Sequence, residues 1–151
     1  MKTLYFIEKI NASPSKVHNL MLQKKSYEEW TKAFSPSSSY RGDWSEGSKI
    51  FFVSSEHGME NSGMIASVDK NIPGDIVIIR HLGILSDQVE QYDGEHVDPW
   101  RNSLEVYRFR NENGQTVLTC SLELNSDEHE QMFSEMWPKA LKVLKEICER
   151  K

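Results

Sequence analysis

The chain has 151 residues, of which 38% are hydrophobic and 27% charged, and this length favours one domain with one core. Its formal net charge is −5 and no basic run exceeds two residues, so neither a nucleic acid nor an anionic membrane surface is expected as a partner. No apolar run approaches the roughly 20 residues of a membrane span, and the N-terminus lacks the apolar core and cleavage site of a signal peptide, which predicts a cytoplasmic protein.

Large and soft apolar side chains are frequent, with four Trp and six Met. Such side chains suit either an ordinary core or an interior that receives a guest molecule. The two cysteines, Cys120 and Cys148, fall at apolar positions of a strand-like and a helix-like pattern. We therefore predict buried, free thiols in a reducing compartment.

The first part of the chain predicts one strand and two short helices. Residues 2–11 have the composition of a strand. Ser13 is a good N-cap, and Pro14 falls at the first helical position, where its missing N–H costs nothing. Apolar spacing then predicts a short helix after Pro14 and a second short helix over residues 24–34.

Between residues 39 and 124 the sequence mostly predicts antiparallel strands joined by turns, with a hairpin loop at 56–61. The nearly continuous apolar run at 75–85 is typical of a central strand that is covered on both faces. Residues 116–124 alternate, and their leucine face is where the last helix should lie. The expected strands are 39–43, 49–55, 62–68, 75–85, 104–110 and 116–124.

Residues 86–102 interrupt this rhythm with an acidic segment that is long for a loop in a compact domain. Two interpretations stay open. The segment is a lid that Trp100 anchors across a cavity, or it is a surface excursion that one aromatic side chain holds in place.

Residues 127–151 predict the clearest amphipathic helix of the chain. At ~100° per residue, its apolar side chains form a stripe roughly 140° wide. Asp127 and Glu130 have the spacing of a capping box. So wide a stripe requires a large apolar surface to cover it, and the strands before it are the obvious candidate.

Pro138 lies in the middle of this predicted helix. Its ring cannot accept helix geometry without displacing the carbonyl of Ser134, so we expect a kink. The helix before the kink, from Met132 to Trp137, is then expected to tilt from the sheet and form one wall of a cavity mouth.

Strands beside segregated helices predict an α+β fold with a curling antiparallel sheet. Several short motifs occur along the chain in a characteristic order and spacing: Ala12-Ser13-Pro14-Ser15-Lys16-Val17, Trp30, Gly47-Ser48-Lys49, Gly63, Val68, Asn113-Gly114-Gln115-Thr116-Val117-Leu118 and Trp137-Pro138-Lys139-Ala140-Leu141. By these residues the chain resembles the START-like, helix-grip (SRPBCC) superfamily, and within it the homologues of the activator of the heat-shock protein 90 ATPase.

The resemblance implies a single START-like domain over residues 1–151. Its curved antiparallel sheet of about six to seven strands would wrap around the long C-terminal helix, with two short helices after the first strand and a cavity between sheet and helix. Superfamily members include carriers, sensors, cyclases, hydratases and dehalogenating enzymes, and they share no catalytic motif. The best-known activator protein adds a separate chaperone-binding domain, for which this chain is too short.

The candidate ligand-binding residues are mostly apolar and aromatic, as the walls of a small-molecule site need to be. A plainly packed core with the same side chains is the alternative. The candidates are Trp30, Phe34, Trp44, Phe52, Met64, His81, Trp100, Tyr107, Met132, Phe133, Met136 and Trp137.

Among them, His81 follows an apolar run and could orient a carboxylate or act as a base; alternatively it is a hydrogen-bonded, space-filling histidine. No catalytic residue, metal or cofactor is predicted. The pairs His57/Glu60 and His96/Asp98 lack the spacing of a known metal site, and GxSxG, GxxxxGK[ST] and GxGxxG motifs are absent.

Three functions remain open. A small apolar or aromatic ligand bound without catalysis predicts a sizeable cavity. A chaperone or other protein partner predicts a filled core and an exposed apolar patch. A cyclase- or hydratase-type enzyme, with His81 or a loop acid as base, predicts at least two titratable groups that converge in the cavity.

Overall fold

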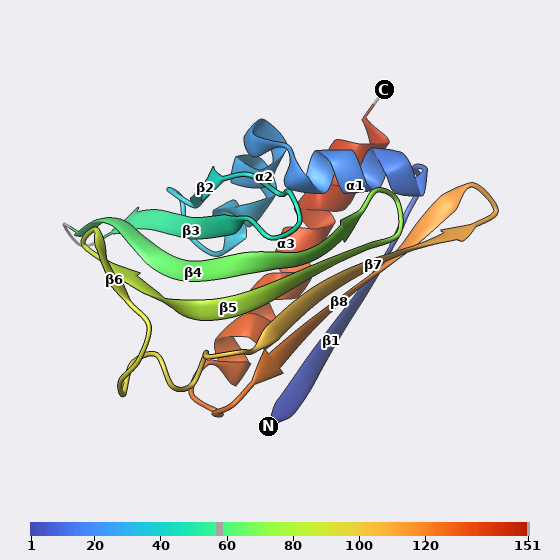
Figure 1. The fold of residues 1–151 in the computed structure, drawn as a ribbon. Coiled ribbons are helices and arrows are strands. Elements are labelled where there is room, and N and C mark those ends of the chain that lie inside the picture. Colours follow the sequence, from blue (N-terminus) through green and yellow to red (C-terminus); the bar gives the residue numbers. More distant parts are fainter. Residues whose placement is uncertain (57–58, 151) are drawn as a thin grey trace.

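A computed structural model of the chain describes residues 1–56 and 59–150. The expected hairpin loop at 56–61 therefore lies partly outside the described residues, and so does His57 of the pair considered for metal binding. The fold is α+β, as predicted: one curved antiparallel sheet, a long C-terminal helix and two short helices after the first strand (Figure 1).

The helical elements agree with the sequence pattern in place and order. They are α1 (Pro14–Leu22), α2 (Lys24–Trp30), a 3-10 turn (Thr31–Ala33) and α3 (Glu130–Glu149). Ser13 caps α1 as expected, because its side chain accepts a hydrogen bond from the N–H of Lys16 at 3.3 Å. None of the described helices is long and apolar enough to cross a membrane.

The sheet of the described residues contains eight strands in the order β1-β8-β7-β5-β4-β3-β2, with β6 paired to β5 alone. All of these pairings are antiparallel, and β1 and β2 form the edges. The strands are β1 (Lys2–Ile10), β2 (Ser39–Gly42), β3 (Lys49–Glu56), β4 (Met59–Ile72), β5 (Ile76–Ser86), β6 (Val89–Gln91), β7 (Leu104–Glu112) and β8 (Gln115–Leu124).

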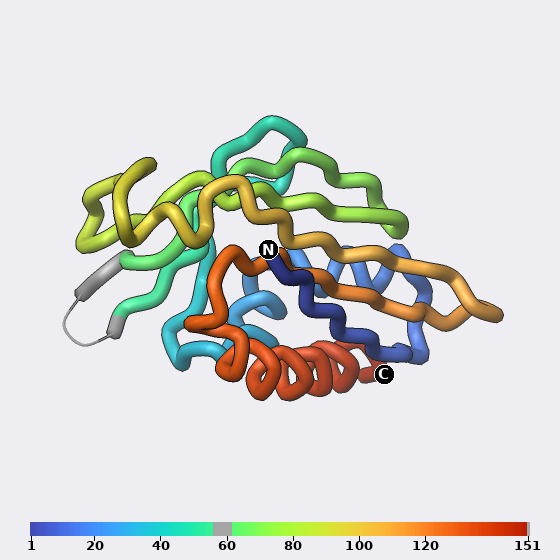
Figure 2. Tube along the Cα trace, turned by 90° about the horizontal axis from the view of Figure 1, so that it is seen from below, coloured from blue at the N-terminus to red at the C-terminus, as the bar shows by residue number. Residues whose placement is uncertain are grey.

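The sheet curls over α3, as Figure 2 shows from below. The pairing of β4 with β5 shifts register twice, at Ile65/Ala66 and at Val68/Lys70. Such irregularities increase twist and bend the strands that carry them, so the sheet can wrap a helix instead of lying flat against it.

Two sequence predictions are corrected here. Strand β6 lies within the expected loop at 86–102, and it is too short and polar to be recognised in the sequence. It pairs with β5 so closely that a Cβ atom at Gly83 would lie 2.1 Å from the carbonyl oxygen of Gln91, so the pairing depends on glycine there. The capping box also does not form. Helix α3 begins at Glu130 with no side-chain cap, because the N–H of Glu130 contacts the carbonyl oxygen of Asp127 at 3.3 Å in a preceding turn.

The core lies between the concave side of the sheet and α3. The second half of α3 packs most tightly and contributes Ala140, Leu141, Leu144 and Cys148, all almost fully buried. The helix continues through Pro138. From β8 the alternating face Leu118, Cys120, Leu122 and Leu124 is buried, as the sequence predicted.

We predict that Leu144→Ala lowers the free energy of unfolding by about 2–5 kcal/mol, because it leaves a cavity at a fully buried position. Glu146→Ala, at an exposed position on the same helix, should change it by less than about 0.5 kcal/mol. Urea denaturation of both variants measures the difference, and equal losses would contradict the packing described for α3.

A second prediction concerns the two cysteines, which are buried and free, as predicted. Burial raises the pKa of the Cys148 thiol from 9.0 to about 11, and burial together with the charge of Glu105 raises the pKa of Cys120 well above its usual value. A raised pKa lowers the thiolate fraction, and only the thiolate is nucleophilic. At about pH 8 the folded protein should therefore resist a disulfide thiol reagent and react at both cysteines in denaturant; rapid labelling of the folded state would refute this.

Candidate ligand-binding cavity

A cavity of about 280 Å³ lies between the first half of α3, the α2 segment and the concave face of the sheet. Its walls come from α2, the 3-10 turn, five strands of the sheet, the segment before β7 and α3. The lining residues are Tyr27, Trp30, Thr31, Phe34, Ser38, Phe52, Met64, His81, Trp100, Glu105, Tyr107, Leu122, Glu123, Met132, Phe133, Met136 and Trp137.

The structure places every predicted ligand-binding residue on this cavity except Trp44. Trp44 packs instead behind the wall, with its ring centroid 5.5 Å from that of Tyr40 and 5.8 Å from that of Phe52. It lies in the connection between β2 and β3, and the sequence pattern does not define which side of such a connection faces inward.

Trp137 holds the aromatic wall together. Its ring lies 5.2 Å from Phe34, 5.9 Å from Trp30 and 6.2 Å from Tyr107, measured between centroids, in tilted or edge-on arrangements that aromatic pairs favour. Trp30 is further fixed by a hydrogen bond of 3.0 Å from its indole N–H to the carbonyl oxygen of Met21. The wall is therefore preformed by contacts within the protein.

Three polar side chains converge inside this apolar surrounding. Glu105 Oε1 lies 3.2 Å from Nε2 of His81, and the hydroxyl of Tyr107 donates a hydrogen bond to Glu105 Oε2. The register explains the convergence: Glu105 faces Ile79 across β7 and β5, which makes His81 its diagonal neighbour on the same face. His81 thus lies in the middle of β5.

An ionised Glu105 only accepts hydrogen bonds, so in a hydrogen bond to that carboxylate Nε2 of His81 is the donor. Nδ1 of His81 and the hydroxyl of Ser103 are two of the three buried side-chain atoms in the described residues that have no hydrogen-bond partner. These two residues are also neighbours, because the N–H of His81 donates to the carbonyl oxygen of Ser103 at 2.9 Å.

Burial raises the pKa of the Tyr107 hydroxyl well above its usual value, and the nearby charge of Glu105 raises it further. Burial likewise raises the pKa of Tyr27, with a further contribution from Glu105. Both phenols therefore stay protonated near neutral pH, and Tyr107 acts as a donor to Glu105.

Glu105 is the main site residue that the sequence interpretation missed. A signal was present: in residues 104–110 it alternates in phase with Tyr107 and Phe109, which are both buried. A carboxylate at an inward position of a strand marks a site more specifically than one in a loop. The other residues that were missed are Tyr27, Thr31, Ser38, Leu122 and Glu123.

Trp100, in the segment between β6 and β7, contacts residues at the beginning of α3. Its ring stacks on His129 with centroids 5.1 Å apart and meets Phe133 edge-on at 5.9 Å. Behind it, Val97 is fully buried and its carbonyl oxygen accepts the N–H of Trp100 at 2.8 Å. This segment therefore covers one side of the cavity.

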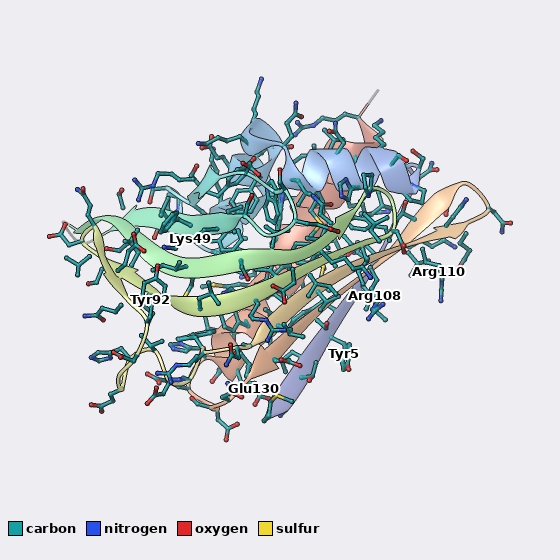
Figure 3. All side chains as sticks on the ribbon, viewed as in Figure 1. Tyr5, Lys49, Tyr92, Arg108, Arg110 and Glu130 are labelled. Atoms are coloured by element: carbon teal, nitrogen blue, oxygen red, sulfur yellow. The ribbon has the colours of Figure 1, made fainter. Side chains whose placement is uncertain are left out.

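Lys49 contacts both β6 and the start of the segment that follows it. Its ammonium nitrogen lies 2.7 Å from Glu90 Oε1 and 5.0 Å from the centre of the Tyr92 ring (Figure 3). His96 and Asp98, the second pair considered for metal binding, lie between these anchor points, and Asp98 pairs with Arg101 at 2.7 Å. Over residues 1–56 and 59–150, no group of three or more His, Cys, Asp or Glu side chains could hold a metal ion.

Comparison with known proteins gives no match to any family model and none to a curated protein. Solved structures do match over nearly the whole chain. The Aha1 dimer from Colwellia psychrerythraea has a TM-score of 0.71 and 19% identity, covering 99% of this chain and 97% of that one. A protein from Mesorhizobium loti has a TM-score of 0.76 and 12% identity, covering 99% and 98%.

An AHSA1-like protein from Aeromonas hydrophila has a TM-score of 0.68 and 11% identity, covering 96% of this chain and 90% of that one. Identities this low establish similarity of fold alone. The chain therefore has the START-like, helix-grip fold, in a form that resembles the homologues of the activator of the heat-shock protein 90 ATPase.

Proposed function

We propose that this protein binds an apolar or aromatic small molecule in the cavity between the sheet and α3. The observation that carries the proposal is the cavity of about 280 Å³ with predominantly aromatic and methionine walls. Small-molecule sites are concave, mostly apolar and supplied with a few polar groups, at volumes from about 300 Å³ upward. A cavity of this volume suits a ligand of up to three rings.

The expected affinity is modest. About ten to twelve buried carbon groups contribute roughly 0.8 kcal/mol each, against an association cost of at least about 4 kcal/mol. The difference of about 4–6 kcal/mol corresponds to dissociation constants between about 1 mM and a few tens of micromolar. Polar contacts inside the cavity would tighten binding beyond this.

A catalytic role is a second candidate, because the titratable groups expected of an enzyme do converge. Glu105 and His81 form a shielded pair at 3.2 Å on the cavity wall. Such a pair could act as a general base on a bound ring compound, in a cyclase- or hydratase-type reaction. Turnover by the wild-type protein that is lost in Glu105→Gln would favour this role over binding alone.

A protein partner, such as a chaperone, is supported by a different observation. Tyr5 and Ile7 are 68% and 67% exposed on edge strand β1, on the outer face of the sheet, where Figure 3 shows Tyr5. Exposed apolar side chains that adjoin one another can mark an interaction site. A protein-binding role predicts a filled core, and the cavity of about 280 Å³ does not support that prediction.

We predict that Met136→Trp, which adds side-chain volume inside the cavity, weakens binding of the neutral fluorescent probe N-phenyl-1-naphthylamine by at least about tenfold. The matched control is Ile72→Trp, which introduces the same side chain at an exposed position outside the cavity. Fluorescence titration measures both variants, with circular dichroism to verify folding. Equal binding by both variants would place the probe elsewhere and contradict the proposal.

If the segment from Tyr92 to Ser103 is a lid, a bound ligand should slow its amide exchange. Trp100 connects this segment to His129 and Phe133, so a ligand against Trp100 would stabilise those contacts. Hydrogen exchange with and without the same probe should show slower exchange there and unchanged exchange in the β7–β8 turn at Asn113 and Gly114. Unchanged exchange in both segments would identify a passive surface excursion.

A further inference from the structure

The permanently charged side chains that line the cavity in the described residues are all acidic. Its lining includes two carboxylates, Glu105 and Glu123, whereas none of the described lining residues is Lys or Arg. His81 is the single basic side chain among them. The whole chain is also acidic, with a formal net charge of −5. Low-dielectric walls focus the electric field of charges of one sign, so a ligand in such a cavity experiences a strong potential of that sign.

Glu105 has no permanent cation as a partner. Its side chain is only 13% exposed, and within the described chain its one ion-pair contact is with His81, which is charged only when protonated. The arginines of β7 cannot reach it, because Arg108 and Arg110 alternate with the inward residues and lie on the outer face (Figure 3). A shielded carboxylate is costly unless a positive charge compensates it.

Glu105 also keeps room for another donor. A carboxylate has about four acceptor sites on its two oxygens. The hydrogen bonds from His81 and Tyr107 occupy one on each oxygen. A donor group on a ligand could therefore bind Glu105 without displacing either neighbour.

The walls around this carboxylate suit a cation as well. The ring centroid of His81 lies 6.3 Å from that of Phe52 and 6.4 Å from that of Trp100. Tyr107, which donates to Glu105, has its ring centroid 6.2 Å from that of Trp137, and all of these rings line the cavity. The faces of such rings carry negative potential and attract ammonium groups within about 6 Å. Aromatic walls and carboxylate thus favour the same kind of charge.

We infer that the ligand is an organic cation: an apolar, ring-containing body with a protonated amine that donates a hydrogen bond to Glu105. This inference rests on the proposed function and specifies its ligand class. Carboxylic acids of the same shape should bind more weakly, because a second negative charge beside Glu105 would be repelled with little screening in a shielded site.

The test uses three probes with one ring skeleton: 2-naphthylmethylamine, which is positively charged at neutral pH, 2-naphthylmethanol, which is neutral, and 2-naphthoate, which is negative. Isothermal titration calorimetry of the wild-type protein should give about tenfold tighter binding of the amine than of the alcohol. The carboxylate should bind at least about tenfold more weakly than the alcohol. This order needs no variant, so it stands even if a substitution prevents folding.

Glu105→Gln removes the charge but keeps the shape, so it should weaken amine binding by about tenfold and change alcohol binding by less than about threefold. Glu8→Gln is the matched control: Glu8 is similarly shielded, with 11% exposure, but pairs with Lys142 outside the cavity. It should leave all three affinities unchanged.

Each result has a defined meaning. If the alcohol binds as tightly as the amine, or if Glu105→Gln leaves the preference for the amine intact, the cation inference is overturned while the proposed function stands. If none of the three probes binds and N-phenyl-1-naphthylamine also fails to bind, the proposed function itself is overturned.

Discussion

The packing of α3 into the concave side of the sheet is the constraint on which the other features depend. A stripe as wide as that of α3 cannot be covered by a flat surface, and the register shifts between β4 and β5 allow the sheet to curl around it. The two halves of the helix then have different surroundings. After Pro138, Ala140, Leu141 and Leu144 are buried in the core. Before it, the side chains of Met132, Phe133 and Met136 face the cavity. One helix thus stabilises the fold with one half and lines the candidate site with the other.

The polar groups of the site follow from the same geometry. Alternation along β7 places Glu105 and Tyr107 on the concave face of the sheet. It places Arg108 and Arg110 on the outer face. The inward carboxylate therefore lies among rings, and its contacts are His81 and Tyr107. Natural cores rarely accept such a group without compensation, because shielding a charge costs several kcal/mol. A cost of this kind at a cavity wall is the pattern expected of a binding or catalytic site.

The sequence predicted most of the fold, because local patterns carried it. Ser13 and Pro14 marked the first helix, the alternation of 116–124 marked β8, and the apolar stripe after residue 127 marked α3. The sequence-based prediction was wrong where the structure depends on contacts between backbone segments. Strand β6 has no pattern of its own and forms because Gly83 of β5 allows a close backbone approach. The capping box failed because the backbone carbonyl of Asp127 accepts the N–H that its side chain was expected to accept.

For the site, the sequence by itself determined the supply of large aromatic and methionine side chains and the elements that carry them, since those depend on residue type and local periodicity. It could not determine that Trp44 lies behind the wall, or that Glu105 and His81 meet. These depend on which strands are neighbours and in what register, and residues 24 positions apart in the chain come within 3.2 Å only when β5 pairs with β7. The shape of the cavity and the chemistry inside it are therefore properties of the tertiary structure.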